Sequence, residues 1–372
     1  MSALGVFLAL LLVLLFIKKV YSLYCLSNVD VSLSISAATA TEGDKLILTE
    51  VVTNRKWLPL PWLAVKFQVD RELVFADKGA AAISDFYYRN DLFHVLMHQK
   101  ITRRLGFTCT KRGFYVIHGL EVTGWDILME HKYIRQFENE TQLIVYPRTF
   151  ETDELNALCT RIYGQLRTIY PINQDPFSFR GVREYSPHDP MKSINFKASA
   201  KTTELMVNVW DFSNARQIVF LLDAERHSAW HDENTEERAV KIIASLAEKF
   251  TAQGVPMSFI TNGLLTPRPG THQHGEIPEG RGEAHLRKIL EALAFVDFNL
   301  SETNVIPLSE IICRLGGVIP ENNPEYIIVS PYYSKAVASA CSTLKESGER
   351  CTWVIPGEKP KDFDYAEEII FI

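Results

Sequence analysis

The chain lacks the cysteine patterns of zinc sites and of disulfide-rich domains. Its six cysteines are scattered over 372 residues, with no CxxC pair and no cluster of Cys and His. Structural zinc sites and small secreted folds need such closely spaced ligands or pairs. Scattered thiols are typical of proteins in a reducing compartment, so the sequence favours a cytosolic environment for the body of the chain.

A basic charge excess is also missing. The formal net charge is −6, whereas a nucleic-acid-binding domain usually carries a basic face. The chain has no glycine-rich loop of the kind that cradles phosphates and no nucleophile elbow. These absences argue against nucleic-acid binding and against the commonest forms of phosphate-dependent and serine-dependent catalysis.

The first seventeen residues, MSALGVFLALLLVLLFI, contain no charged side chain, and Lys18 and Lys19 follow at once. As a helix this run spans about 25 Å, and snorkelling lysines with Tyr21 and Tyr24 can extend it to the roughly 30 Å of a bilayer core. Positive charge after the apolar run is unlike a cleaved signal peptide and places the body in the cytoplasm. We predict a single-pass cell-membrane anchor over residues 1–20, with a peripheral anchor as the alternative.

The remaining chain divides by pattern, which predicts a multi-domain α+β protein. Residues 28–148 alternate apolar and polar positions in short runs, which is typical of an antiparallel β-sandwich. Residues 213–372 alternate apolar strands with helical periods, which predicts a doubly wound α/β domain, with a poorly ordered loop at 264–284. Between them, residues 149–212 have too few apolar positions for a core of their own and are expected to pack on a neighbouring domain.

The segment 179–211 reads FRGVREYSPHDPMKSINFKASAKTTELMVNVWD. It resembles the hallmark of the bacterial domain of unknown function 58 family, and nearly the whole chain is covered by the resemblance. The matched positions are Gly181, Val182, Arg183, Glu184, Tyr185, Asp189, Lys192, Ile194, Phe196, Lys197, Ala200, Lys201, Leu205 and Val207. The chain departs from that pattern at His188, where Gly is usual, and at Lys192, Phe196 and Lys201.

The resemblance implies a membrane segment, a β domain and a degenerate von Willebrand factor A-like domain over residues 213–372. It also implies a partner, because members of this family are thought to work with a MoxR-type AAA+ ATPase. No cofactor is implied. We therefore expect a non-enzymatic, membrane-anchored cytoplasmic adaptor or scaffold that contacts the lipid bilayer through residues 1–17.

The charged segment supplies the candidate binding or interdomain residues, which are Arg183, Glu184, Tyr185, Asp189, Lys192, Asn195 and Lys197. Either they clamp two domains together or they meet a partner. A hydrolase-like enzyme that uses acid and base groups of residues 180–201 is the alternative, because Asp189 lies next to a histidine. Opposite charges that alternate along a segment more often form ion pairs than catalytic sets.

A magnesium site is the other candidate. Von Willebrand A domains hold Mg²⁺ with a DxSxS pattern after the first strand, and hard cations require such oxygen ligands. Here Asp223 is followed by Glu225 and His227 at the two serine positions, with Arg226 between them. We therefore expect no metal site and assign Asp223 to a turn at the sheet edge, while a magnesium-dependent binding protein stays the weaker alternative.

Overall fold

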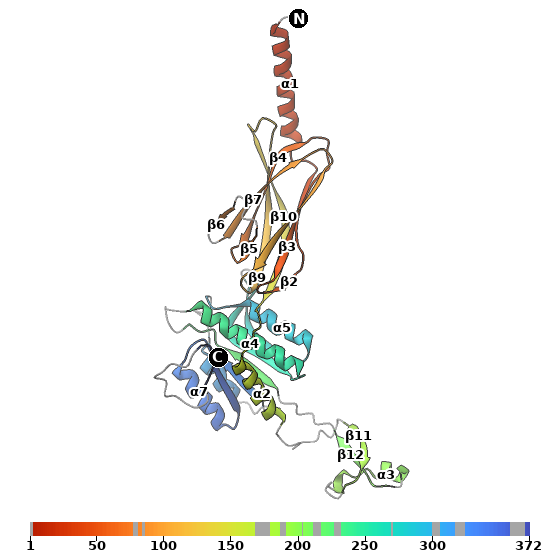
Figure 1. Ribbon diagram of the computed structural model, residues 1–372, viewed down its shortest axis with the longest axis vertical. Helices are drawn as coiled ribbons and strands as arrows, with labels where there is room; N and C mark the ends of the chain where they lie inside the picture. Colours follow the sequence, from red (N-terminus) through yellow and green to blue (C-terminus); the bar gives the residue numbers. More distant parts are fainter. Residues whose placement is uncertain are drawn as a thin grey trace. The chain divides into compact units, whose positions relative to one another are not determined.

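The computed structural model describes residues 3–76, 81–83, 86–167, 179–186, 191–202, 204–210, 217–226, 232–268, 271–299, 306–316, 324–357 and 369–372. These residues form a mixed α/β protein, as expected (Figure 1). The chain divides into two compact units. Unit 1 comprises Met1–Arg148, Thr266–Thr271 and Leu293–Phe295, and unit 2 comprises Thr149–Leu265, His272–Ala292 and Val296–Ile372.

The N-terminal apolar helix is confirmed. Helix α1 runs over Ala3–Tyr24, a leucine-rich stretch without proline, so good helix formers meet no breaker. Its segment Gly5–Tyr24 has a mean hydropathy of 2.3 and is the one helix in the described ranges that is long and apolar enough to cross a membrane. Its side chains from Val6 to Phe16 are exposed, as a lipid-facing helix requires.

Unit 1 contains two β-sheets. The four-stranded sheet has the order β1 (Val29–Ile35), β3 (Lys45–Asn54), β8 (Lys100–Cys109) and β5 (Leu73–Phe75). The six-stranded sheet has the order β2 (Thr39–Thr41), β10 (Lys132–Tyr146), β9 (Gly113–Trp125), β4 (Leu60–Asp70), β7 (Phe86–Val95) and β6 (Ala81–Ile83). Every neighbouring pair is antiparallel apart from β2 and β10.

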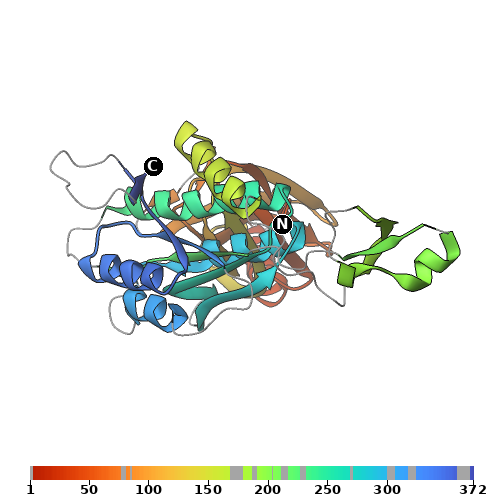
Figure 2. The ribbon, with the colours of Figure 1, turned by 90° about the horizontal axis from the view of Figure 1, so that it is seen from below.

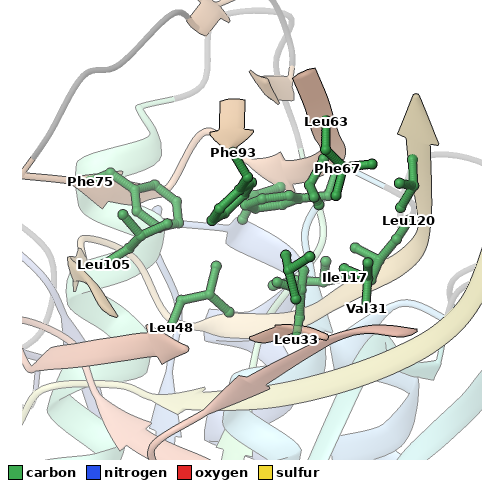
Figure 3. Close-up of a cluster of buried hydrophobic side chains, with 14 of the residues drawn as sticks. Val31, Leu33, Leu48, Leu63, Phe67, Phe75, Phe93, Leu105, Ile117 and Leu120 are labelled. Carbon is green, nitrogen blue, oxygen red and sulfur yellow. The ribbon is translucent and has the colours of Figure 1, made fainter. Parts of the chain in front are cut away.

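One hydrophobic cluster draws its side chains from both sheets of unit 1. Leu48 and Leu105 come from the four-stranded sheet, and Leu63, Phe93 and Leu120 come from the six-stranded sheet. Figure 3 shows these side chains pointing toward one another. Alternate residues of a strand point to opposite faces, so the predicted two-residue period delivers one apolar face per sheet to this core.

Unit 2 is built on a mostly parallel sheet. Its strands lie in the order β15 (Thr271–Gly280), β14 (Met257–Arg268), β13 (Ile218–Leu222), β17 (Glu325–Val329), β18 (Arg350–Ile355) and β19 (Ile369–Phe371), and the short β16 (Val296–Asp297) pairs with β14. The strands from β14 to β19 along this path are parallel. In chain order they read 2-1-3-4-5, so the direction of winding reverses between β13 and β17.

Helices cover both faces of this sheet (Figure 2). Phe220 of β13 meets Phe250 of helix α4 (Glu233–Ala252), with 6.4 Å between ring centroids. Val219 and Leu221, which point to the opposite face, belong to a cluster with helices α6 (Leu308–Gly316) and α7 (Lys335–Glu346). Helix α5 (Glu283–Phe295) adjoins β14, because the His285 ring is hydrogen-bonded to the Met257 carbonyl. Strands covered on both sides are apolar throughout, which is why β13 reads as a continuous hydrophobic run.

Two expectations for unit 2 were wrong in detail. The predicted loop at 264–284 is occupied by the end of β14 and the whole of β15, which pair with each other in the sheet. The segment 149–212 contains a helix, α2 (Asp153–Arg167), that the sequence analysis did not identify. Its buried residues, Leu155, Leu158 and Ile162, recur at helical spacing, and the helix packs on α4.

Candidate functional site

The charged segment folds into a small substructure that we call the hallmark module, residues 179–186, 191–202 and 204–210 (Figure 1). Strand β11 (Phe179–Glu184) pairs antiparallel with β12 (Met206–Trp210). A turn of 3₁₀ helix (Met191–Ser193) and helix α3 (Phe196–Thr202) lie between them in sequence. Val207 is the side chain of this module that is almost completely buried, at 1% exposure.

Asn195 organises the module. Its side-chain oxygen accepts a hydrogen bond from the Ala198 amide at 2.9 Å, so Asn195 caps the N-terminus of α3. Its side-chain nitrogen donates to Asn208 Oδ1 at 2.6 Å, and its amide donates to the Met206 carbonyl at 2.7 Å. Ser199 completes the link, because its hydroxyl accepts from the Met206 amide at 2.8 Å. Asn195 therefore joins α3 to β12 and has a structural role.

The structure describes the side chains of four other predicted residues. Arg183, Glu184 and Lys197 are exposed, and Tyr185 is half-buried. The Arg183 guanidinium donates to the adjacent Glu184 carbonyl at 3.0 Å. Asp189 lies outside the described residues, and Lys192 is placed only by its backbone in the 3₁₀ turn. The side chains that the structure describes therefore present charge to solvent and form no enclosed acid–base set.

The same module exposes large apolar side chains. The exposed fraction is 74% for Phe196 and 76% for Met191, and Val182 and Leu205 are also exposed. Scattered single apolar side chains are normal on a surface, but four of them in a module of this size need an explanation. Aromatic, methionine and arginine side chains are the types enriched in protein–protein interfaces.

A second candidate lies at the carboxyl edge of the unit 2 sheet, where α/β folds usually bind ligands. Asp223 follows β13 and is 1% exposed. Its Oδ1 accepts from the Glu225 amide and from Asn262 Nδ2, each at 3.1 Å. Asn262 in turn accepts from the Ala224 amide at 2.7 Å. Asp223 thus holds the turn after β13, in the role that its position suggested.

The space beside this turn contains an ion pair. Arg226 donates from Nε and Nη2 to the two oxygens of Glu236, at 2.9 and 3.0 Å, and from Nη1 to Asn299 at 2.8 Å. The side chains of Arg226 and Glu236 are only 7% and 3% exposed. A bidentate guanidinium–carboxylate pair of this kind is geometrically specific and satisfies its own charges.

The side-chain contacts of the described residues at this edge can be compared with those of metal centres and of activated nucleophiles. In the part of the chain that the structure describes, no three His, Cys, Asp or Glu side chains gather to hold a metal. Ser330 follows β17 and is fully buried, yet its hydroxyl has no hydrogen-bond partner among the described residues. A nucleophilic serine requires an adjacent hydrogen-bonded base, so this hydroxyl is not activated.

A third group of buried charges lies in unit 1. The side chains of Arg89 and Asp91 on β7 are 1% and 6% exposed and form an ion pair at 2.6 Å. Arg103 of β8 reaches the other Asp91 oxygen at 2.9 Å. The guanidinium of Arg89 also lies 5.1 Å from the Phe75 ring centroid, in a cation–π arrangement.

Glu50 of β3 adds a further carboxyl group to this cluster. It is fully buried, and neither of its oxygens accepts a hydrogen bond from a donor among the described residues. Burial, and next the charge of Asp91, raise the pKa of Glu50 to about 8. The carboxyl group of Glu50 is therefore mostly protonated and neutral near pH 7.

The six-stranded sheet of unit 1 also carries an open groove of about 1130 Å³, over β4, β7, β9 and β10. Its lining mixes polar and apolar surface, and Lys66 and Glu121, which are cross-strand neighbours on β4 and β9, pair with each other at 2.9 Å. Tyr88 is the large apolar side chain that it exposes. The groove is the solvated face of the sheet.

Comparison with known proteins adds one relative of similar length. The chain is 20% identical over 354 residues to the uncharacterized protein YeaD of Bacillus subtilis (strain 168), which covers 94% of this chain and 81% of that protein. No family model matches.

Among solved structures, a non-cellulosomal cohesin from Archaeoglobus fulgidus covers 35% of this chain and 97% of its own, with 10% identity and a TM-score of 0.22. The seventh type I cohesin of ScaB from Pseudobacteroides cellulosolvens covers 33% of this chain and 96% of its own, with 11% identity and a TM-score of 0.21. Scores this low transfer neither a fold nor a function, so the site is defined by this chain's own residues.

Proposed function

We propose that the protein is a membrane-anchored cytoplasmic adaptor that binds a MoxR-type AAA+ ATPase through its hallmark module. In this proposal α1 spans the cell membrane, unit 1 is an antiparallel β-sandwich beside the bilayer, and unit 2 is a degenerate von Willebrand factor A-like domain. The parallel order 2-1-3-4-5 with helices on both faces supports the assignment of unit 2.

The observation that carries the proposal is the surface of the hallmark module. A short helix and two strands, held together by Asn195, present Phe196 and Met191 beside exposed Lys197 and Arg183. An exposed apolar anchor with charged neighbours is the usual composition of a protein-binding hot spot and its polar rim. Catalysis would instead need a nucleophile or base held in a concave pocket.

The carboxyl edge of unit 2 supports a binding role without metal. Arg226, three residues after Asp223, is held by both oxygens of Glu236, so neither member of this pair is a free ligand for a cation. One oxygen of Asp223, Oδ1, already accepts two N–H groups. An adaptor would need this edge of the unit 2 sheet only to be stably folded, without a bound ion.

The test is a binding measurement with two purified proteins. The full-length protein in nanodiscs would be titrated with a purified MoxR-type AAA+ ATPase, and the double variant Phe196→Ser, Lys197→Glu should bind at least about tenfold more weakly, as expected for a hot spot. Leu92→Ser, which removes an apolar side chain 51% exposed on unit 1, is the matched control and should bind normally.

Equal affinity of the double variant and the wild type would refute the assignment of the module as the docking surface. Helical content of the variants should match the wild type, because Asn195, which caps α3, is untouched.

A further inference from the structure

The end of unit 1 at which α1 enters is tightly built. The Tyr21 hydroxyl donates to the Pro59 carbonyl at 2.9 Å, and the Lys56 ammonium donates to the carbonyls of Cys25 and Ser27 at 2.6 and 2.8 Å. Tyr21 and Cys25 are 1% and 2% exposed, inside the core cluster of unit 1. The helix therefore passes into the β-sheets without a flexible linker.

Three loops surround this end of the helix. They connect β3 to β4 (residues 55–59), β7 to β8 (96–99) and β9 to β10 (126–131). The first two are joined to each other, because the His98 amide donates to the Lys56 carbonyl at 3.1 Å. The third reaches the helix through an ion pair between Glu130 and Lys18.

The tips of these loops are apolar and uncovered. The exposed side chains are Trp57 (63%), Leu96 (64%), Met97 (59%), Ile127 (52%), Leu128 (47%) and Met129 (52%). We call these six residues the collar. Every one of the three loops contributes, although loops normally carry polar tips because they face water.

The collar is held rigidly. In the third loop Asp126 accepts from the Met129 amide through its carbonyl and from the Glu130 amide through its carboxylate, at 3.1 and 2.9 Å. Met129 and His98 adopt left-handed backbone conformations, with φ of 56° and 50°. A left-handed backbone conformation is unfavourable for a non-glycine residue and persists only where the surrounding contacts hold it. The backbone of these two loops is therefore fixed, and so is the position of their apolar tips.

The contact of Lys18 with the third loop shows at which point along α1 the collar lies. This residue comes directly after the seventeen-residue apolar run, and Glu130, the neighbour of Met129, is its ion-pair partner. At 1.5 Å per residue, the third loop therefore lies within about one helical turn of the point where the apolar run ends. A bilayer that contains the run brings its headgroup layer to the collar.

The collar also has the charge that a membrane surface selects. Lys100 and Lys132 lie directly beside the loops, and Arg55 lies in the first loop, where it forms an exposed ion pair with Asp30 at 3.6 Å. The acidic residues of the third loop are engaged, since Asp126 is buried and Glu130 pairs with Lys18. Tryptophan at such a position is typical of the interface between headgroups and acyl chains.

We propose that the collar inserts into the interfacial layer of the bilayer that α1 spans, so that unit 1 is bound to the membrane by three loops as well as by its helix. The occupant is lipid, with preference for anionic headgroups, and the proposal rests on the anchoring role proposed above for α1. The collar lies at the end of the apolar run of α1, which distinguishes it from an ordinary protein-docking patch. A protein that covered the collar would have to displace the lipid headgroups that surround this end of the helix.

The experiment uses the full-length chain in protein-free nanodiscs of phosphatidylcholine and phosphatidylglycerol. In a Cys313→Ser background, which removes the exposed thiol, single cysteines at Met97→Cys and Leu128→Cys would carry an environment-sensitive fluorophore. The quencher is a lipid with a nitroxide near its headgroup. The Cys313→Ser protein without an added cysteine measures the background labelling of the remaining thiols.

Two further positions calibrate the result. Leu12→Cys in α1 reports whether the helix is embedded. Val74→Cys, 50% exposed on β5, lies opposite Thr108, eight residues along β8 from Lys100 and thus about 26 Å from the collar. The labels at 97 and 128 should lose most of their fluorescence to the lipid quencher, whereas the label at 74 should keep its intensity.

The possible failures are distinct. A quenched label at 12 with unquenched labels at 97 and 128 overturns the collar and leaves the anchor standing, and it is also the outcome expected if a protein covers these loops in the cell. An unquenched label at 12 overturns the anchor and the collar together. Phosphatidylcholine alone should give weaker quenching at 97 and 128 than the mixture with phosphatidylglycerol.

Discussion

Two regions of the molecule bury opposite charges in different ways. At the carboxyl edge of unit 2, Arg226 and Glu236 match one to one, with two hydrogen bonds between fixed planar groups. In the core of unit 1, Asp91 pairs with two guanidinium groups, whereas neither oxygen of Glu50 accepts a hydrogen bond from the described residues. Both carboxylate oxygens of Glu236 and of Asp91 receive guanidinium N–H groups, whereas the buried Glu50, which receives none, has a raised pKa and takes up a proton.

The strongest test of this comparison is Arg89→Ala in unit 1. The change leaves Asp91 buried with less compensation, and breaking a buried pair typically costs about 3–5 kcal/mol of unfolding free energy. The measurement is urea unfolding of the full-length protein in detergent, with hydrogen exchange of the β7 amides to assign the effect to unit 1.

Arg71→Ala is the control, because the pair of Arg71 with Glu72 is exposed and should contribute less than about 1 kcal/mol. If Arg89→Ala were as mild as Arg71→Ala, the cluster in unit 1 would not be a buried ionic network.

Arg226→Ala should destabilise unit 2 by about 3 kcal/mol, since Glu236 loses both hydrogen bonds while it stays buried. Local hydrogen exchange at the N-terminus of α4 measures the change, and unit 1 should be unaffected. Arg314→Ala breaks an exposed pair with Glu310 in α6 and should cost only a few tenths of a kcal/mol. If Arg226→Ala and Arg314→Ala lowered the stability by the same amount, the Arg226–Glu236 pair would not be a buried ion pair that stabilises unit 2.

Glu50→Gln tests the surplus carboxyl group through pH. In the folded state the pKa of Glu50 is raised from 4.5 to about 8, so the folded protein holds a proton that the unfolded chain has lost. Stability therefore falls as pH rises through this window, by up to about 1.4 kcal/mol per pH unit. Glutamine imitates the protonated form and should remove that slope, making the variant more stable than the wild type near pH 8.

The matched control is Glu121→Gln, which alters a glutamate that is partly exposed and paired with Lys66 in the same unit. An unchanged slope of stability with pH in Glu50→Gln would show that the Glu50 carboxyl group is ionised in the folded state.

The smallest expected effect is that of magnesium. Added Mg²⁺ should leave the melting temperature unchanged, because Asp223 is occupied by N–H donors and a guanidinium lies nearby. A ligand that binds the folded state must raise its stability by mass action, so a thermal shift measures this directly. A rise in melting temperature that disappears in Asp223→Ala would establish a metal site.

Several features could be predicted because they depend on local periodicity. Alternation predicts the strands of unit 1, and it also places Glu50 on the face of Leu48 and Val52, a signal of burial that the charge of the residue hides. In the same way Arg89 and Asp91 share the face of Phe93. The helical spacing of Leu155, Leu158 and Ile162 is sufficient to identify α2.

The candidate site was less predictable. Its charged residues are adjacent in sequence, but Asn195 forms the interior of the hallmark module while Arg183, Glu184 and Lys197 face outward. Asn208 and Ser199, which complete the contacts of Asn195, carry no signal in a single sequence because small polar residues are common in turns.

The sequence by itself determined the apolar helix, the alternating strands and the alternation of strand and helix, because each depends on side chains a few residues apart. Only the tertiary structure decided which charges pair, which stay exposed, and that three loops gather apolar side chains at the end of α1. These features join residues as far apart as Lys18 and Glu130, and burial and hydrogen-bond geometry, which govern them, exist only once the chain is folded.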